Sequence, residues 1–242
     1  MVSLEKNEDG VYRLKTPFSN LEIGVIAKSA NRVDYTLESE AVRRSEKELI
    51  RGFTGIETKN IVGLNQLHGD GMFMLHEEPS RDTLVYGEAD GFITRLTGTC
   101  LLIRTADCVP VFSYDRRKRV LGAVHSGWRG TRLSIARKLV SEMKNRWGSE
   151  YRDVYLFILP SIGPDSYTVG KDVADLFPYD IIEKNGMLYL NLWQNIERSV
   201  REEGVPADNI FSAEVCTLLS NIEFFSHRGG DAGRNLNFGF LT

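Results

Sequence analysis

Three side chains that can bind a metal ion stand out in the sequence: His68, Cys108 and His125. Each lies where an apolar run meets a glycine or a turn, and functional side chains are often presented at such strand ends. Two imidazoles and one thiolate suit Zn²⁺, and three protein ligands leave a fourth tetrahedral position open for water or substrate. The residue types therefore predict a catalytic zinc site. In the alternative reading, the histidines cap strands and Cys108 is a small buried hydrophobic residue, because the spacing matches no compact metal motif.

A second candidate site is the glycine-containing segment 126–131, which reads Ser-Gly-Trp-Arg-Gly-Thr. An apolar strand is expected before it and an amphipathic helix after it, and free N–H groups at a helix start favour a phosphate. Arg129 can add a bidentate contact to that anion. The residues expected to bind phosphate are Ser126, Gly127, Arg129 and Gly130. Alternatively, this segment is a surface turn in which Arg129 lies over the Trp128 ring.

Two aspartates near these residues are candidate catalytic groups. Asp107 precedes Cys108, and Asp90 follows Glu88-Ala in another predicted turn. A carboxylate there can carry protons or hold a metal-bound histidine in place, although aspartates are also common as turn residues. We expect Cys108, His125, Asp107 and Asp90 to form the catalytic group.

Composition limits the classes of ligand and of location. The 242 residues are 42% hydrophobic and 26% charged, with a net charge of -3, so there is no basic surface excess for nucleic acid. No apolar run approaches the ~18 residues of a membrane helix, and the charged N-terminus is unlike a signal peptide. Three scattered cysteines favour a reducing compartment. We expect a cytoplasmic monomer or homodimer that binds a small polar or anionic ligand and neither nucleic acid nor membrane.

The elements that must position these residues are short strands and four helices. Apolar runs predict strands at residues 21–27, 61–67, 72–75, 91–94, 100–105, 109–114, 120–125, 154–159 and 223–226. Helical spacing appears at residues 39–51, 131–147, 171–177 and 192–203. No linker or repeat interrupts the chain, so we expect one domain over residues 1–242. Its fold class is α/β (α+β), with mixed β-sheets in a sandwich covered by helices.

Four ordered motifs together resemble the YfiH-type laccase-domain family, whose members are also called polyphenol oxidases and purine nucleoside phosphorylases. They are Gln66-Leu-His-Gly69, Ala89-Asp-Gly91, Thr105-Ala-Asp-Cys-Val-Pro-Val111 and Ala123-Val-His-Ser-Gly-Trp-Arg-Gly130. The resemblance continues through Ile162-Gly-Pro164, Tyr167, Phe224-Phe-Ser226 and Gly233-Arg234. It therefore spans the chain from about Ile61 onwards.

The resemblance implies a zinc ion on His68, Cys108 and His125, in a fold shared distantly with a toxin class of cysteine hydrolases. It also implies phosphorolysis of adenosine, inosine, guanosine and methylthioadenosine, with adenosine deamination as a side activity. Copper and laccase-like oxidation of phenols are attached to the same family. The substrates are then a purine nucleoside and phosphate. The residues that we expect at the substrate are Gln66, Tyr167, His227 and Arg228.

The chain departs from the family pattern in three segments. The arginine-containing, glycine-rich loop expected near the N-terminus is replaced at residues 21–35, so a substrate contact from this loop is open. Asp165 and Ser166 stand where a cysteine pair often precedes the tyrosine. The usual Ser-Tyr-Arg-Arg is Ser226-His-Arg-Gly229, which removes one arginine and adds an imidazole.

Two other classes of function fit the same side chains. A multicopper laccase needs a mononuclear and a trinuclear copper site, and four histidines are too few for both. A single copper on the three ligands, with Met72 or Met74 nearby, would imitate an electron carrier. A metal-free hydrolase would use Cys108 as nucleophile and His125 as base. The predicted anion loop favours phosphorolysis.

Overall fold

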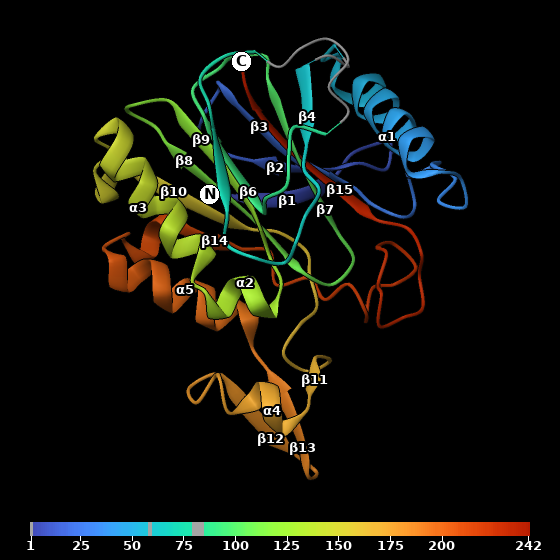
Figure 1. Cartoon of the computed structure of the whole chain (residues 1–242), viewed down its shortest axis with the longest axis vertical. Helices are drawn as coiled ribbons and strands as arrows, with labels where there is room; N and C mark the ends of the chain where they lie inside the picture. The colour runs from blue at the N-terminus through green and yellow to red at the C-terminus, as the bar shows by residue number, and fades with distance from the viewer. Residues whose placement is uncertain (1, 58–59, 79–84) are drawn as a thin grey trace.

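Two six-stranded β-sheets pack face to face in the computed structural model, which describes residues 2–57, 60–78 and 85–242 (Figure 1). In strand order, the first sheet comprises β1 (Ser3–Lys6), β2 (Tyr12–Lys15), β3 (Leu21–Ile26), β15 (Asn235–Leu241), β7 (Cys100–Thr105) and β4 (Ile61–Gly63). The second comprises β14 (Ile210–Ser212), β10 (Val154–Ile158), β8 (Val109–Asp115), β9 (Val120–Ser126), β6 (Gly91–Thr94) and β5 (Met72–Leu75). Both sheets contain parallel and antiparallel pairs, so the predicted mixed sandwich is confirmed.

The main core lies between the two sheets. Its buried side chains come from both, for example Ile23 and Leu101 from the first and Phe112 and Leu121 from the second. Strands buried on both faces are expected to be almost wholly apolar, as β8 and β9 are.

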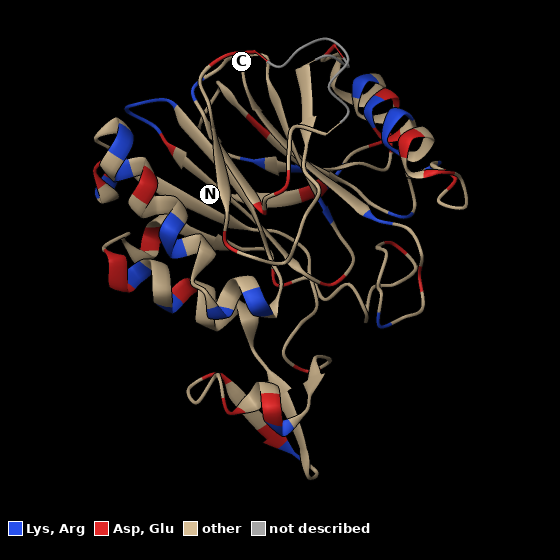
Figure 2. Cartoon of the chain, viewed as in Figure 1, with Lys and Arg blue, Asp and Glu red and all other residues tan. Residues whose placement is uncertain are grey.

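Helices cover the two outer faces of the sandwich (Figure 1). Helix α1 (Ser39–Thr54) packs on the first sheet through Ile50. Helices α3 (Ile135–Trp147) and α5 (Leu192–Glu203) pack on the second sheet through residues such as Leu139 and Ile196. The layers are therefore helix, sheet, sheet, helix. Lys and Arg alternate with Asp and Glu along these three helices, as solvated helix faces normally do (Figure 2).

A small sheet projects from the sandwich, at the bottom of Figure 1. It consists of β11 (Thr168–Val169), β13 (Met187–Leu190) and β12 (Ile181–Lys184), and the short helix α4 (Lys171–Ala174) accompanies it. Short 3₁₀ turns at Tyr151–Asp153 and Ala207–Asn209 precede β10 and β14. Among the described residues, no helix is long and apolar enough to cross a membrane.

Most predicted elements are present, and the exceptions have local causes. The strand predicted at 223–226 is wrong, because the Asn235 side chain satisfies both the N–H and the C=O of Phe225 and leaves a turn there. The helix predicted at 131–147 is two helices, α2 (Trp128–Arg132) and α3, because Ser134 adopts a left-handed φ of 58°. Leu133 consequently lies outside the buried stripe and is 44% exposed.

Candidate metal centre and cavity

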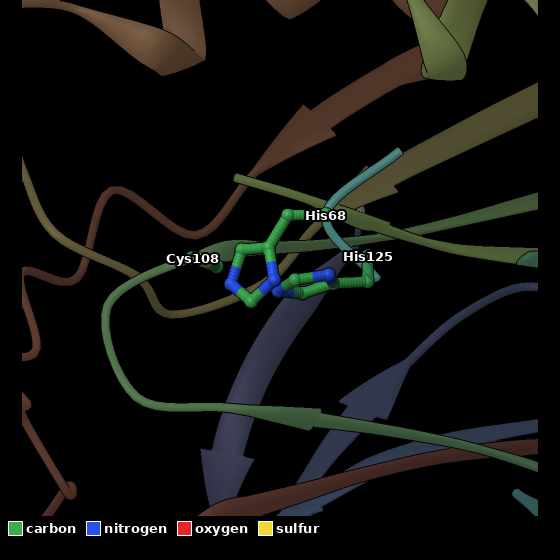
Figure 3. Close-up of side chains that lie close together, drawn as sticks. All are labelled: His68, Cys108 and His125. Carbon is green, nitrogen blue, oxygen red and sulfur yellow. The ribbon is translucent and has the colours of Figure 1, made fainter. Parts of the chain in front are cut away.

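His68, Cys108 and His125 come together at one edge of the sandwich. His68 follows β4, Cys108 lies between β7 and β8, and His125 is on β9. One ligand atom from each side chain lies within 4.8 Å of the others. Figure 3 shows the rings of His68 and His125 next to each other, and their centres are 4.8 Å apart. His68 is exposed and His125 is buried, so the group has one side open to the outside. This group can hold a metal ion.

Asp90 fixes the two histidines from behind. Its Oδ1 accepts hydrogen bonds from His125 Nδ1 at 2.8 Å and from the backbone N–H of His68 at 2.9 Å. Its Oδ2 accepts from the N–H groups of Leu67 and Gly69 at 3.2 and 2.7 Å. Because Nδ1 of His125 is occupied, Nε2 is left for a metal, which is the usual arrangement of a metal-binding histidine and its carboxylate partner. Asp90 is therefore a positioning residue.

The backbone around the ligands is shaped to bring them together. His68 has a left-handed φ of 61°, which turns the 67–69 segment around the Asp90 carboxylate. A side chain at Gly127 would lie 2.9 Å from Cys108 Sγ and 3.3 Å from His68 Cδ2. Gly127 thus allows the backbone at the start of α2 to approach Cys108 and His68 closely, a packing role that its place in a predicted phosphate loop did not reveal.

Electrostatics favour an ionised thiol at Cys108. Burial raises the pKa of this thiol, but interactions with His125 and His68 outweigh burial and lower it to about 6. Burial lowers the pKa of His125, whereas Asp90 and the thiolate raise it to about 9. Without a metal, the pair is therefore a thiolate beside an imidazolium. A thiolate is the form that binds metal or acts as a nucleophile.

A cavity of about 660 Å³ opens over the three ligands. This volume is within the usual range for small-molecule sites. The lining includes His68, Cys108 and His125, and it includes five further residues predicted at the site: Gln66, Asp107, Tyr167, His227 and Arg228. The predicted catalytic and substrate residues are thus brought together, and each lines the cavity except Asp90, which is 1% exposed and lies behind the ligands.

Protein contacts already occupy several of these side chains. The Gln66 amide donates to Arg104 O and accepts from Arg104 N, which extends the pairing of β4 with β7. The Arg228 guanidinium lies 5.0 Å from the centre of the Tyr167 ring and donates to Thr168. Burial and the nearby Cys108 raise the pKa of Tyr167 to about 12, so its phenol stays protonated at neutral pH.

Asp107 holds the cavity wall together beside Cys108. Its Oδ1 accepts from Thr217 Oγ1 at 2.7 Å, and its Oδ2 accepts from the backbone N–H of Arg228 at 2.8 Å. Asp107 has a left-handed φ of 86°, an unusual conformation for a non-glycine residue that often marks a functional site. Asp107 is also one of the residues that line the cavity.

The predicted phosphate loop lies beside the cavity and is tightly packed. Ser126 Oγ is buried and hydrogen-bonded to Thr131 Oγ1 at 2.8 Å. The Arg129 guanidinium lies 4.5 Å from the centre of the Trp128 ring, as in the alternative reading. A side chain at Gly130 would meet Gly69 O at 3.0 Å. Within the described part of the chain, none of these four predicted phosphate residues lines the cavity.

The sequence did not indicate one wall of the cavity. We call it the α1 wall, formed by α1, the segment before it and the arginine opposite them, and its members are Tyr35, Leu37, Ser39, Val42, Arg43, Glu46 and Arg104. Arginines on an amphipathic helix are read as solvated residues, so no pattern singled out Arg43. Arg104 is opposite α1 because α1 packs on the sheet that contains β7, where Arg104 pairs with Glu46.

A family model described as "Multi-copper polyphenol oxidoreductase laccase" matches residues 18–242, including the N-terminal segment that departs from the expected motif. The structure of YlmD from Geobacillus stearothermophilus superimposes with a TM-score of 0.89 at 24% identity, covering 100% of this chain and 99% of that one. At this identity the match supports the fold alone.

Two curated relatives have names that describe activities. One from Bacteroides thetaiotaomicron, named "Purine nucleoside phosphorylase", is 33% identical over 217 residues, which cover 83% of this chain and 80% of the relative. Another, from an unidentified prokaryote, is named "Adenosine deaminase RL5". It is 28% identical, and the alignment covers 97% of both chains.

Proposed function

We propose that this chain, which belongs to the multi-copper polyphenol oxidoreductase laccase family, is a zinc-dependent purine nucleoside phosphorylase. The observation that carries this proposal is the His68, Cys108 and His125 group at a cavity of about 660 Å³. The relatives named for phosphorolysis support the choice of reaction. In this proposal the enzyme takes adenosine, inosine, guanosine and methylthioadenosine, and it also deaminates adenosine.

The donor set fits zinc. His68 and His125 offer imidazole nitrogens, Cys108 offers a thiolate at neutral pH, and Asp90 fixes the tautomer of His125. A bound Zn²⁺ supplies a Lewis acid that polarises an oxygen at the open side of the group. Copper is the second candidate ion, since imidazole and thiolate also suit it.

The chain's own residues have distinct roles in phosphorolysis. A phosphate oxygen forms a bond to the ribose C1′ while the C1′–N9 bond breaks, and the purine leaves with that electron pair and takes up a proton. Asp107 lines the cavity next to Cys108 and is our candidate for carrying this proton. Gln66, Tyr167, His227 and Arg228 border the nucleoside, and the Tyr167 ring can stack on the base.

Two further activities are supported by specific observations. Deamination needs water in place of phosphate at the same cavity, and the relative named as an adenosine deaminase supports it. A metal-free cysteine hydrolase is favoured by two contacts: Cys108 interacts with His125, and His125 is hydrogen-bonded to Asp90. This arrangement resembles a nucleophile, its base and the group that orients the base. A multicopper laccase needs several metal-binding groups. The described residues contain one such group, which disfavours the laccase activity named in the family's description.

One assay separates these activities. The purified protein, with its metal content measured, is incubated with adenosine over a phosphate titration, and adenine, hypoxanthine, ribose 1-phosphate and inosine are quantified. We expect ribose 1-phosphate to equal the sum of adenine and hypoxanthine, to rise with phosphate and to be abolished by a chelator. Adenine release that is independent of phosphate would contradict phosphorolysis. Activity that survives chelation but is lost on thiol alkylation would favour the cysteine hydrolase.

A further inference from the structure

The α1 wall contains two buried guanidinium nitrogens without a partner. Arg43 Nη1 and Arg104 Nη2 are both inaccessible to solvent and have no hydrogen-bond acceptor among the described residues. Buried N–H donors are nearly always hydrogen-bonded, so an unpaired one in a cavity wall suggests a missing acceptor. Both arginines line the same cavity as His68 and Cys108.

The α1 wall also has an excess of positive charge. Within the described part of the chain, the carboxylate that pairs with these arginines belongs to Glu46, which is 1% exposed and accepts from Arg104 Nε at 2.5 Å. Burial and the proximity of Arg104 both lower the pKa of Arg43, which shows that the two cations are held near one another in a partly dry environment. Since Glu46 balances only one of them, the pair retains about one positive charge.

We propose that Arg43 and Arg104 of the α1 wall bind a phosphate group. Guanidinium groups match phosphate geometry because their planar donors can bind two of its oxygens at once. An anion in the cavity would relieve the repulsion between the arginines, and a rotation of either side chain would bring its unpaired nitrogen to the anion. This site adds a phosphate-binding region to the proposed function. The proposal rests on that function only for the identity of the molecule that carries the phosphate. The source is either inorganic phosphate as the second substrate or the 5′-phosphate of a nucleotide.

Arg104 keeps the site close to the metal ligands. Arg104 lies four residues before Cys108, so their Cα atoms are at most about 14 Å apart. The Arg104 backbone is also hydrogen-bonded to the side chain of Gln66, two residues before His68. A phosphate at the α1 wall would therefore share one cavity with a nucleoside at His68 and Cys108. By contrast, the guanidinium of Arg129 is packed against Trp128 beside that cavity.

The test uses Arg43, because Arg104 cannot be removed without leaving the buried Glu46 unpaired. Arg44 is a matched control: it is the next residue of α1, is exposed, and pairs with Glu40 at 2.6 Å. The wild-type protein, Arg43→Ala, Arg43→Lys and Arg44→Ala, each with its metal content checked, are titrated calorimetrically with inorganic phosphate, with adenosine 5′-monophosphate and with adenosine.

We expect Arg43→Ala to weaken phosphate binding by about tenfold or more, Arg43→Lys to weaken it less, and Arg44→Ala to leave it unchanged. Dependence on Arg43 for inorganic phosphate identifies the second substrate as the source. Dependence only for the nucleotide, and not for adenosine, identifies the 5′-phosphate. The proposal is overturned if wild type binds neither ligand at millimolar concentration, if Arg43→Ala binds like wild type, or if both alanine variants weaken equally.

Failure of this site and failure of the proposed function give different results. If the wild type cleaves adenosine with phosphate while Arg43→Ala keeps both the wild-type KM for phosphate and the wild-type affinity for the nucleotide, the α1 wall is not a phosphate site and the function stands. If the wild type releases no free base but binds phosphate or the nucleotide through Arg43, the proposed function fails and the site stands.

Discussion

The metal group and the α1 wall line the same cavity but are built in opposite ways. Around the metal group, the Asp90 carboxylate accepts four hydrogen bonds and fixes the ligands before any ion arrives. In the α1 wall, Arg43 Nη1 and Arg104 Nη2 have no acceptor among the described residues. The hydrogen bonds that support the metal group are all made within the protein, whereas in our proposal a ligand supplies the missing acceptors of the α1 wall. Preorganised groups and incomplete ones should respond differently to mutation.

The largest effect is expected from removing a ligand of the metal group. Replacing His68, Cys108 or His125 with Ala should abolish both bound metal and activity, since an open three-ligand site is not expected to hold its ion with two ligands. Metal analysis and circular dichroism on each variant check this, and the fold should remain. His76→Ala is the control, because His76 is exposed on the far side, beside Trp147. A ligand variant that keeps stoichiometric zinc would remove that residue from the set.

Acidity should act on the metal group more than on the α1 wall. The Cys108 thiol has its pKa lowered to about 6, so it is ionised above that pH and is protonated as the pH falls through it. His125 has its pKa raised to about 9, so it must lose a proton to bind metal throughout the neutral range. Metal affinity should therefore fall by about a hundredfold or more between pH 7 and pH 5. Competition titrations with a chelator measure this, and equal affinities would argue against Cys108 as a ligand.

Asp90→Asn tests whether the metal group depends on its preorganisation. The amide nitrogen cannot accept a hydrogen bond, so some of the four donors around Asp90 lose their partner. We expect metal affinity to fall by about 10- to 100-fold, as is usual when the partner of a metal-bound histidine is changed. Asp70→Asn is the control, because Asp70 pairs with Lys138 at the surface. Unchanged zinc affinity in Asp90→Asn would show that the ligands need no support.

The smallest of these effects concerns Arg129 and decides between two positions for phosphate. If Arg129 holds the phosphate, Arg129→Ala should raise the KM for phosphate by about tenfold, leave zinc bound and spare deamination, and Arg129→Lys should recover part of the rate. If Arg129 only packs on Trp128, both activities should change together with unchanged phosphate dependence. The formation of adenine, and of inosine plus hypoxanthine, from one adenosine stock measures the two activities in parallel.

The sequence predicted the strands that carry the metal ligands because these strands are apolar on both faces. It missed β15, the strand between β3 and β7, since Asn235, Asn237 and Gly239 interrupt the apolar pattern. Asn237 is fully buried, and its amide donates to Ile103 O and Thr105 Oγ1. A polar residue satisfied by a neighbouring strand cannot be recognised from local hydrophobicity.

The residues of the candidate site also divide into those that the sequence could predict and those that only the fold reveals. His68, Cys108 and His125 could be selected by residue type, and the resemblance to a family supported the selection. The role of Asp90 required the fold, because its partners come from the 67–69 segment and from β9. Arg43 and Arg104 gave no signal at all, since their importance arises from an absent partner and a shared cavity, which depend on where α1 packs.

The position of β15 also governs the order in which the site can assemble. β15 pairs with β3 on one side, with Leu241 opposite Leu21, and with β7 on the other. Contacts between segments so distant in the chain form slowly, because a long loop must close before they are made. Cys108 follows β7 and His68 follows β4, the next strand of the same sheet. We therefore expect metal capture to be a late kinetic event, so that the rate of metal uptake during refolding would report on closure of the first sheet.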